Sequence, residues 1–330
     1  MVVDLQPNLG TLPVILDTEI GGEPDDAMAL VVAARELPEL ALVVTSDELG
    51  GQRARFARYL LDSAGRADVA VVAGHQLSAN PPYFADGLTP DWVGTPSGDV
   101  ARAVAEVGAR SGGVARWIGL GPLSNLAALL AAEPGLGRRL FVTQLTGTWT
   151  EVDQALPPRN FRLDPAAARQ VLASVPHLRL VRYALPGGQP AQLTARSPVI
   201  RQLTGAAPAW AALLAAHCAQ FFARYHPAVI PGGPLALAAA LRLRFAPFGP
   251  ARVAVNGAGG LTASPAGPQG NVLISRDVDY QALADWLCTR LQPGIWTQWS
   301  RPPGLTRAGL TRAGLTRAAA APRAARAVRV

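Results

Sequence analysis

Five carboxylate side chains lie within ten residues near the start of the chain, in the stretch LPVILDTEIGGEPDDAMALVVAA (residues 12–34). An apolar run leads into the group and an alanine-rich helical pattern follows it; the acids are Asp17, Glu19, Glu23, Asp25 and Asp26. Carboxylates this close repel one another and raise each other's pKa unless a positive charge lies among them. A divalent metal ion held by oxygen ligands supplies such a charge, so the stretch predicts a metal site.

The elements that would hold these acids alternate along the chain between strands and helices. Apolar runs predict strands at 12–16, 40–44, 69–73, 114–120, 141–145 and 178–183, with shorter ones near Val253 and Val272. Helical patterns separate most of them, which predicts an α/β fold with an open, mostly parallel sheet flanked by helices. Such sheets place their sites beyond the carboxyl ends of the strands, where Asp17, Glu19 and Asp47 fall.

The composition of the sequence excludes several classes of enzyme and of site. The sequence contains no lysine, which excludes a P-loop and a Schiff-base enzyme. Cys218 and Cys288 lie far apart without clustered cysteine or histidine, which argues against a disulfide scaffold or a zinc site. The first ten residues lack the pattern of a secretion signal, so we expect a cytoplasmic protein. The uncharged stretch from Gln202 to Phe222 predicts a packed helix and not a membrane span.

The excess positive charge belongs to the last thirty residues. Of the 30 basic residues, seven lie in 301–330, a segment without acids, and the remainder of the chain has 23 basic and 23 acidic residues. The segment carries GLTRA three times in tandem, a spacing that suits neither helix nor strand. We therefore expect one domain over 1–300 and a disordered basic repeat tail over 301–330. Nucleic acid is expected as a partner only through this tail.

Four segments, taken in order, resemble the inosine-uridine preferring nucleoside hydrolase family over about residues 12–291. DTEIGGEPDD resembles the family's opening acidic loop, with glutamate at position 19 in place of aspartate. GPLSNLA, NFRLDPAAA and HPAVIPGGPLALAAAL resemble three later segments of the family. The resemblance implies the family's fold and hydrolysis of the N-glycosidic bond of a ribonucleoside or related N-riboside, giving ribose and free base.

The resemblance also implies residue roles. Glu19, Asp26 and the backbone carbonyl of Ser124 would hold calcium, which lowers the pKa of a bound water. Glu19 would take that water's proton as the catalytic base, and Asp17 would orient the other acids. The implied substrate-binding residues, for the ribose and for stacking on the base, are Asp25, Asn160, Trp92 and Trp149. The family's ribose-binding asparagine after the second strand has no match here, and either Asp47 or Glu48 is expected in its place.

This sequence departs from the family where the far half of the site is expected. Gly232-Gly233 stand where the family has a His-Asp pair before Pro-Leu. Because Gly233 replaces the usual aspartate ligand, the expected calcium site is weakened. Two functions therefore remain open: hydrolysis with a calcium-bound water as nucleophile, and a catalytically degenerate relative that binds ribosides without turnover. The expected partner is a small nucleoside, and a homo-oligomer is compatible with either function.

Overall fold

The computed structural model describes residues 9–148, 157–183, 192–267 and 269–294. Its strands are β1 (Val14–Thr18), β2 (Leu40–Thr45), β3 (Ala70–Ala73), β4 (Ala115–Gly119), β5 (Leu140–Thr148), β6 (Leu178–Tyr183), β7 (Leu193–Thr194), β8 (Ala228–Val229), β9 (Phe248–Val255), β10 (Leu261–Pro265) and β11 (Val272–Ser275). Its α-helices are α1 (Pro24–Glu36), α2 (Gln52–Ser63), α3 (Val100–Gly108), α4 (Ser124–Ala132), α5 (Arg159–Arg162), α6 (Pro165–Ser174), α7 (Pro198–Arg201), α8 (Ala209–Arg224), α9 (Gly232–Ala240) and α10 (Tyr280–Arg290).

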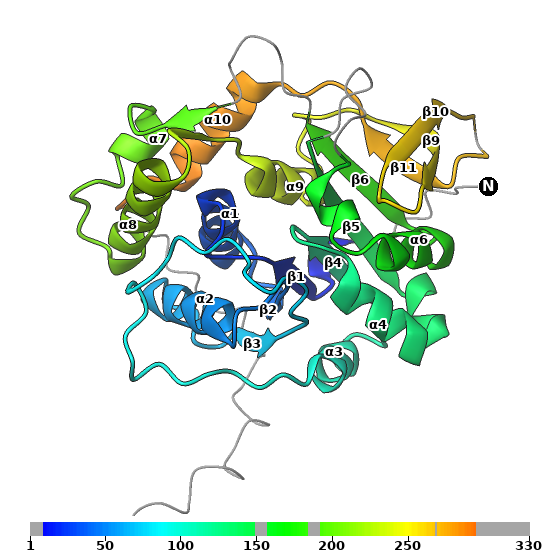
Figure 1. Ribbon diagram of the computed structural model, residues 1–330, viewed down its shortest axis with the longest axis horizontal. Coiled ribbons are helices and arrows are strands. Elements are labelled where there is room, and N and C mark those ends of the chain that lie inside the picture. Colours follow the sequence, from blue (N-terminus) through cyan, green and yellow to red (C-terminus); the bar gives the residue numbers. More distant parts are fainter. Residues whose placement is uncertain (1–8, 149–156, 184–191, 268, 295–330) are drawn as a thin grey trace, which may run out of the picture. The chain divides into compact units, whose positions relative to one another are not determined.

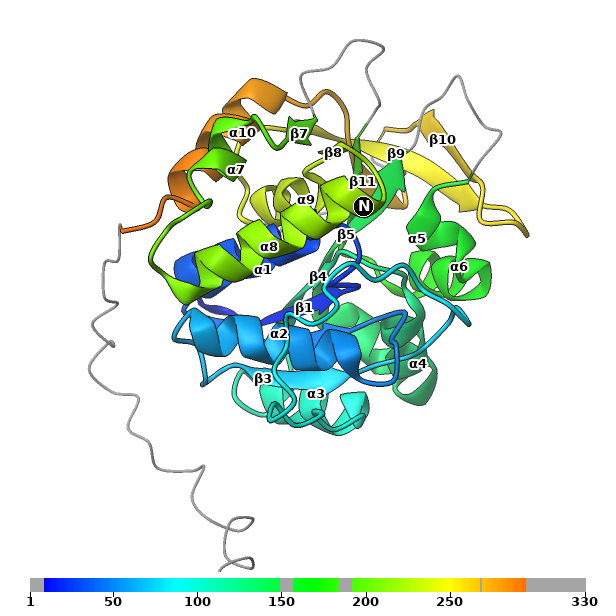
Figure 2. The same cartoon turned by 60° about the vertical axis from the view of Figure 1, so that its left-hand side comes forward.

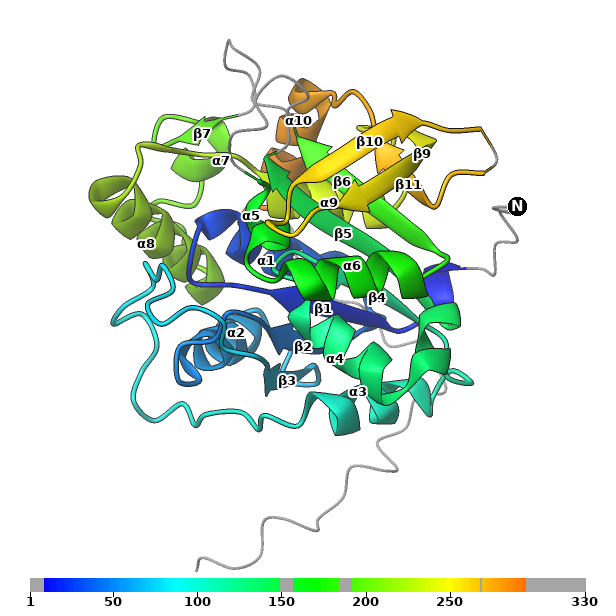
Figure 3. The same ribbon diagram turned by 45° about the vertical axis from the view of Figure 1, so that its right-hand side comes forward.

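One sheet of nine strands runs through the molecule in the order β10-β9-β11-β6-β5-β4-β1-β2-β3 (Figure 1). The strands from β3 to β6 pair in parallel, and β11 continues parallel to β6. Only β9 and β10 run antiparallel to their neighbours, at the end of the sheet opposite β3 (Figure 3). The predicted open, mostly parallel α/β sheet is confirmed.

Two hydrophobic layers cover the sheet. On one face, α1, α2 and α9 pack against alternate strand residues such as Val14 and Leu16, and α8 and α10 join the same layer. On the other face, Ile15 and Trp117 contact the layer formed by α3, α4 and α6. Helices α8 and α9 both pack against α1, and Figure 2 shows α8 in front of α1. This packing brings chain segments about two hundred residues apart into one layer. The central strands are buried on both faces, as their continuous apolar runs predict.

The predicted strand boundaries agree within two residues with those observed for β1 to β4 and for β6. Strand β5 continues three residues past the predicted end at 145. It carries a register shift between Leu145 and Gly147, where Gly147 has φ 96°. This irregularity turns the end of β5 in a conformation that favours glycine.

No helix among the described residues is long and apolar enough to cross a membrane. Of the stretch predicted to be a packed helix, residues 209–222 lie in α8, whereas 202–208 form turns before it. The side chains of Trp210 and Cys218 in α8 are buried in the core. Residues 301–330, the predicted tail, lie outside the described residues.

Candidate functional site

The site lies at the carboxyl edge of the sheet, where β1 pairs with β2 on one side and β4 on the other. Asp17 is the fourth residue of β1 and is 1% exposed. The amide nitrogen of Asn125, near the start of α4, donates to its carboxylate at 3.1 Å. The same nitrogen donates to the carbonyl oxygen of Thr45 at 3.0 Å, so a single side chain ties together the ends of β1, β2 and β4.

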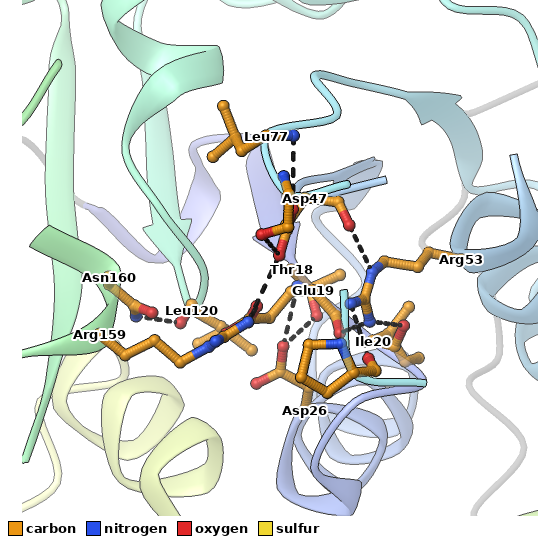
Figure 4. A network of polar contacts seen from close by, with 12 residues as sticks. Thr18, Glu19, Ile20, Asp26, Asp47, Arg53, Leu77, Leu120, Arg159 and Asn160 are labelled. Atoms are coloured by element: carbon orange, nitrogen blue, oxygen red, sulfur yellow. Dashed lines mark hydrogen bonds and ion pairs between the residues drawn. The ribbon is translucent and has the colours of Figure 1, made fainter. Parts of the chain in front are cut away.

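The acidic loop folds back onto the start of α1. The carboxylate of Asp26 accepts from the Thr18 hydroxyl at 2.6 Å and from the backbone N–H of Glu19 at 3.0 Å (Figure 4). Asp25 and Asp26 occupy the first turn of α1, behind Pro24, where the helix dipole favours negative charge. The loop therefore gains its shape from its own acids.

Helix α9 closes the loop from the far end of the chain. The backbone N–H of Gly233, in the first turn of α9, donates to the carboxylate of Asp25 at 2.8 Å. A Cβ built on Gly233 would lie 3.2 Å from a carboxylate oxygen of Asp26, so a side chain at this position would face the acids. The predicted closeness of Gly232-Gly233 to the acidic loop is confirmed, and the glycine leaves that side without a carboxylate.

Arg159, which the sequence pattern did not indicate, brings a positive charge into direct contact with the cluster. Its Nε and Nη2 donate to the two carboxylate oxygens of Glu19, at 3.2 and 2.9 Å. Nη2 also lies 3.4 Å from the carboxylate of Asp47 (Figure 4). Burial lowers the pKa of Arg159, but Glu19 and Asp47 outweigh it and raise that pKa further above its usual range. In a chain without lysine, an arginine beside the expected Asn160 was the available signal.

Asn160 follows Arg159 in the short helix α5 and is buried. Its amide nitrogen donates to the carbonyl oxygens of Leu120 and Leu145, at 2.5 and 3.1 Å, just past β4 and within β5. Its side chain thus anchors α5 against the carboxyl ends of two strands. This anchoring fixes the direction from which Arg159 approaches the acidic loop.

Asp47 has a left-handed backbone conformation, φ 46°, directly after β2. Its carboxylate accepts from the backbone N–H and the hydroxyl of Ser78, at 2.7 and 3.0 Å. The carboxylate of its neighbour Glu48 is occupied by other hydrogen bonds. The Glu48 carboxylate accepts from the Thr45 hydroxyl and from the backbone N–H groups of three residues at the start of α2, Leu49, Gly51 and Ala54. Asp47 alone of this pair faces the cluster.

Two buried side chains that the sequence analysis passed over support the loop backbone. Arg53 of α2 is fully buried and donates to the carbonyl oxygens of Glu19, Ile20, Asp47 and Pro82. Nε2 of the buried His217 lies 3.0 Å from the carbonyl oxygen of Gly22. Burial lowers the pKa of His217 to about 4, so the ring is neutral at pH 7 and Nε2–H donates to that carbonyl. Both residues hold the loop from outside the acid cluster.

The surroundings of these acids favour the protonated carboxyl group over the charged carboxylate. Burial raises the pKa of Asp17 to about 7, partly offset by the hydrogen bond from Asn125. Burial, followed by the repulsion of neighbouring carboxylates, raises the pKa of Asp25 to about 7 as well. The pKa of Asp26 is raised well above its ordinary value, again mainly by burial. Such perturbed acids, gathered at one sheet edge, are typical of a functional site.

The expected calcium ligands do not come together as a metal site. Among the described residues, no group of three or more His, Cys, Asp or Glu side chains is placed to hold a metal ion. Glu19 is paired with Arg159, and the carboxylate of Asp26 accepts from the Thr18 hydroxyl and from the N–H of Glu19. Ser124, whose backbone carbonyl was the third expected ligand, is the first residue of α4. Position 233 contributes only a backbone N–H, to Asp25. The donors present therefore do not fit the calcium ion that the family resemblance implies.

Of the two tryptophans expected to stack on a base, only one lies within the described residues. Trp92 is 75% exposed, and its ring packs edge-on against Tyr59 of α2 at a centroid distance of 5.8 Å. Trp149 lies outside the described residues. Trp92 therefore contacts α2, and its stacking on a base stays a prediction.

Comparison with known proteins identifies relatives of this arrangement. Residues 14–285 match the family described as inosine-uridine preferring nucleoside hydrolase. Among solved structures, the plant nucleoside hydrolase PpNRh1 is 19% identical with a TM-score of 0.64, covering 86% of this chain and 99% of that one. The inosine-uridine preferring nucleoside hydrolase of Bacillus anthracis is 16% identical with a TM-score of 0.66, covering 85% and 99%.

A purine-preferring ribonucleoside hydrolase from Gardnerella vaginalis is 21% identical with a TM-score of 0.65, covering 85% of this chain and 98% of that one. These likenesses show the shared fold. No curated protein sequence matches the chain significantly.

Proposed function

The chain belongs to the inosine-uridine preferring nucleoside hydrolase family, and on that premise we propose that it hydrolyses the N-glycosidic bond of a ribonucleoside or related N-riboside. The observation that supports this most directly is the set of acids that one loop brings to the carboxyl edge of the sheet: Asp17, Glu19, Asp25 and Asp26. Carboxylates accept hydrogen bonds from sugar hydroxyls. They also stabilise the positive charge that develops on a ribosyl ring as its C–N bond breaks.

Each acid has a role in the proposed reaction. Asp25 accepts a hydrogen bond from a ribose hydroxyl, with Asp47 and Asn160 as further ribose contacts. A water attacks the anomeric carbon and gives one proton to Glu19, while the bonding pair of the C–N bond leaves with the base nitrogen. That nitrogen then takes a proton from solvent, and ribose and free base result. Asp17 keeps the neighbouring acids in place from within β1.

Calcium in such a site would supply a water of lowered pKa. Because the donors described here do not fit the ion, no step above depends on it. Glu19 then acts as a base while both of its carboxylate oxygens accept hydrogen bonds from Arg159. The expected rate is correspondingly below that of a metal-activated hydrolase.

Riboside binding without turnover is the second candidate, and the Glu19–Arg159 pair favours it. Two hydrogen bonds to one guanidinium engage both oxygens of the expected base. The absence of a carboxylate at Gly233 acts in the same direction. In this case the acids would still hold the ribose hydroxyls.

Release of reducing sugar from a panel of purine and pyrimidine ribonucleosides distinguishes the two candidates. Wild type is compared with Glu19→Gln and with the control Glu106→Gln, which changes an exposed residue of α3. Each protein is assayed with calcium and with a chelator. A hydrolase predicts turnover that Glu19→Gln lowers at least about a hundredfold and Glu106→Gln leaves unchanged. No release at high protein concentration, or equal release from wild type and Glu19→Gln, would sink the hydrolase proposal; calorimetry with the same ribosides then tests binding alone.

We retain three further expectations as proposals: a cytoplasmic role in nucleoside salvage, a domain ending near residue 300, and nucleic-acid contact only through the tail. Deleting residues 301–330 should abolish any salt-sensitive nucleic-acid binding and leave riboside turnover unchanged. Binding that survives the deletion contradicts the assignment to the tail.

A further inference from the structure

Two arginines reach the acidic loop, and they use their donors differently. All the hydrogen bonds described for Arg53 go to backbone carbonyl oxygens. Those of Arg159 go to carboxylates, with two on Glu19 and one on Asp47. Arg53 therefore shapes the loop, whereas Arg159 neutralises its acids.

Neighbouring residues hold Arg159 in the position from which it contacts these carboxylates. It opens α5, which follows the glycine-containing irregularity of β5, and the neighbouring Asn160 fastens the helix to Leu120 and Leu145. The side chain is 31% exposed, while Glu19 is 17% and Asp47 0% exposed. A guanidinium in this setting is always charged and matches a carboxylate with two parallel hydrogen bonds. Figure 4 shows it extending from α5 toward the loop after β1.

A divalent ion and this guanidinium cannot share Glu19. An ion bound to the carboxylate would lie within a few ångströms of Arg159, and like charges at such distances repel strongly in a partly buried site. The ion would also lack a carboxylate from the α9 side, since Gly233 offers only its N–H to Asp25. Metal and arginine are therefore alternatives at this position.

We propose that Arg159 is the built-in cation of the site: its guanidinium takes the place of a divalent metal ion, so the fold and its riboside binding are independent of calcium. Only the identity of the ligand rests on the proposed function. Unlike a metal ion, a guanidinium donates hydrogen bonds without binding water as a Lewis acid, so it can position a hydroxyl or a water molecule but does not lower the water's pKa as a metal does. Arg159 is thus a positioning residue for Glu19 and Asp47.

The test measures calcium binding without turnover. Thermal unfolding and calorimetric calcium titration are performed on wild type, Arg159→Ala, Arg159→Lys and the control Arg162→Ala, which removes an exposed arginine from the same helix. Wild type and Arg162→Ala should unfold at the same temperature in chelator and in millimolar calcium. Arg159→Ala should unfold at a lower temperature in chelator, because Glu19 and Asp47 lose their partner.

Calcium should restore the stability of Arg159→Ala, with affinity at least about tenfold above wild type and a dissociation constant on the order of 10⁻⁴ to 10⁻³ M. Arg159→Lys keeps the charge and should stay insensitive to calcium. Stoichiometric calcium binding or calcium-dependent stability in the wild-type chain overturns the proposal, even if Arg159→Ala fails to fold. An Arg159→Ala protein that neither binds calcium nor regains thermal stability in its presence also overturns the proposal. A chain without hydrolase activity would leave all these readouts intact, so the two proposals fail separately.

Discussion

Replacing Asp17 with asparagine should make the protein more stable at pH 8 and leave it almost unchanged at pH 4. Asp17 is 1% exposed and its pKa rises from 3.8 to about 7, mainly through burial. In the folded chain it therefore keeps its proton until about pH 7, while in the unfolded chain it releases it near 3.8. Unfolding in this window releases a proton, so each increase in pH favours the unfolded state.

The size of the effect follows from the same two pKa values. A difference of about three pKa units is about 4 kcal/mol, reached above pH 7 and absent below 3.8. That figure is an upper bound, because Asp26, whose charge also raises the pKa of Asp17, has a raised pKa itself and titrates in the same cluster. An asparagine at position 17 has no charge to bury, and its carbonyl oxygen can still accept the hydrogen bond from Asn125.

Urea unfolding of wild type and Asp17→Asn at pH 4, 6 and 8 tests this expectation. The variant should gain stability relative to wild type as pH rises, by up to about 1.4 kcal/mol per pH unit between the two pKa values. The control Asp91→Asn changes an exposed residue and should follow wild type throughout. If Asp17→Asn is destabilised equally at all three pH values, the carboxylate is stabilised by its partners and burial does not dominate.

Three further variants test the supports of the site by urea unfolding beside wild type. Glu48→Ala removes the acceptor for the Thr45 hydroxyl and for three backbone N–H groups at the start of α2, and should cost about 3 kcal/mol. Gly74→Ala would drive a Cβ into the carbonyl oxygen of Thr45 and should cost at least about 2 kcal/mol, whereas Gly94→Ala meets nothing within 4 Å and should stay within about 0.5. Arg53→Met leaves four backbone carbonyls without this donor, two of them in buried hydrogen bonds, and should cost about 3 kcal/mol. Losses below about 1 kcal/mol in the first and third variants would contradict these assignments.

The fold was largely predictable because its signals are local and repeated. Buried parallel strands require continuous apolar runs, and the runs at 40–44 and 178–183 lie within one residue of the observed strands. Alternation with helices then determines the side of the sheet on which a site forms. The exception is β5, whose continuation past residue 145 depends on the register shift beside Gly147. That shift depends on pairing with β6, which no local pattern encodes.

The sequence by itself determined that one loop carries five acids, that they lie at a strand end, and that they need a positive partner. It also predicted that Gly232-Gly233 bring no carboxylate to them. The tertiary structure decided which partner they receive, because Arg159 lies 140 positions from Glu19 and meets it only when α5 is fastened beside β4 and β5. The spacing of residues along a sequence shows where like charges lie close together, whereas only tertiary packing shows which opposite charge lies beside them.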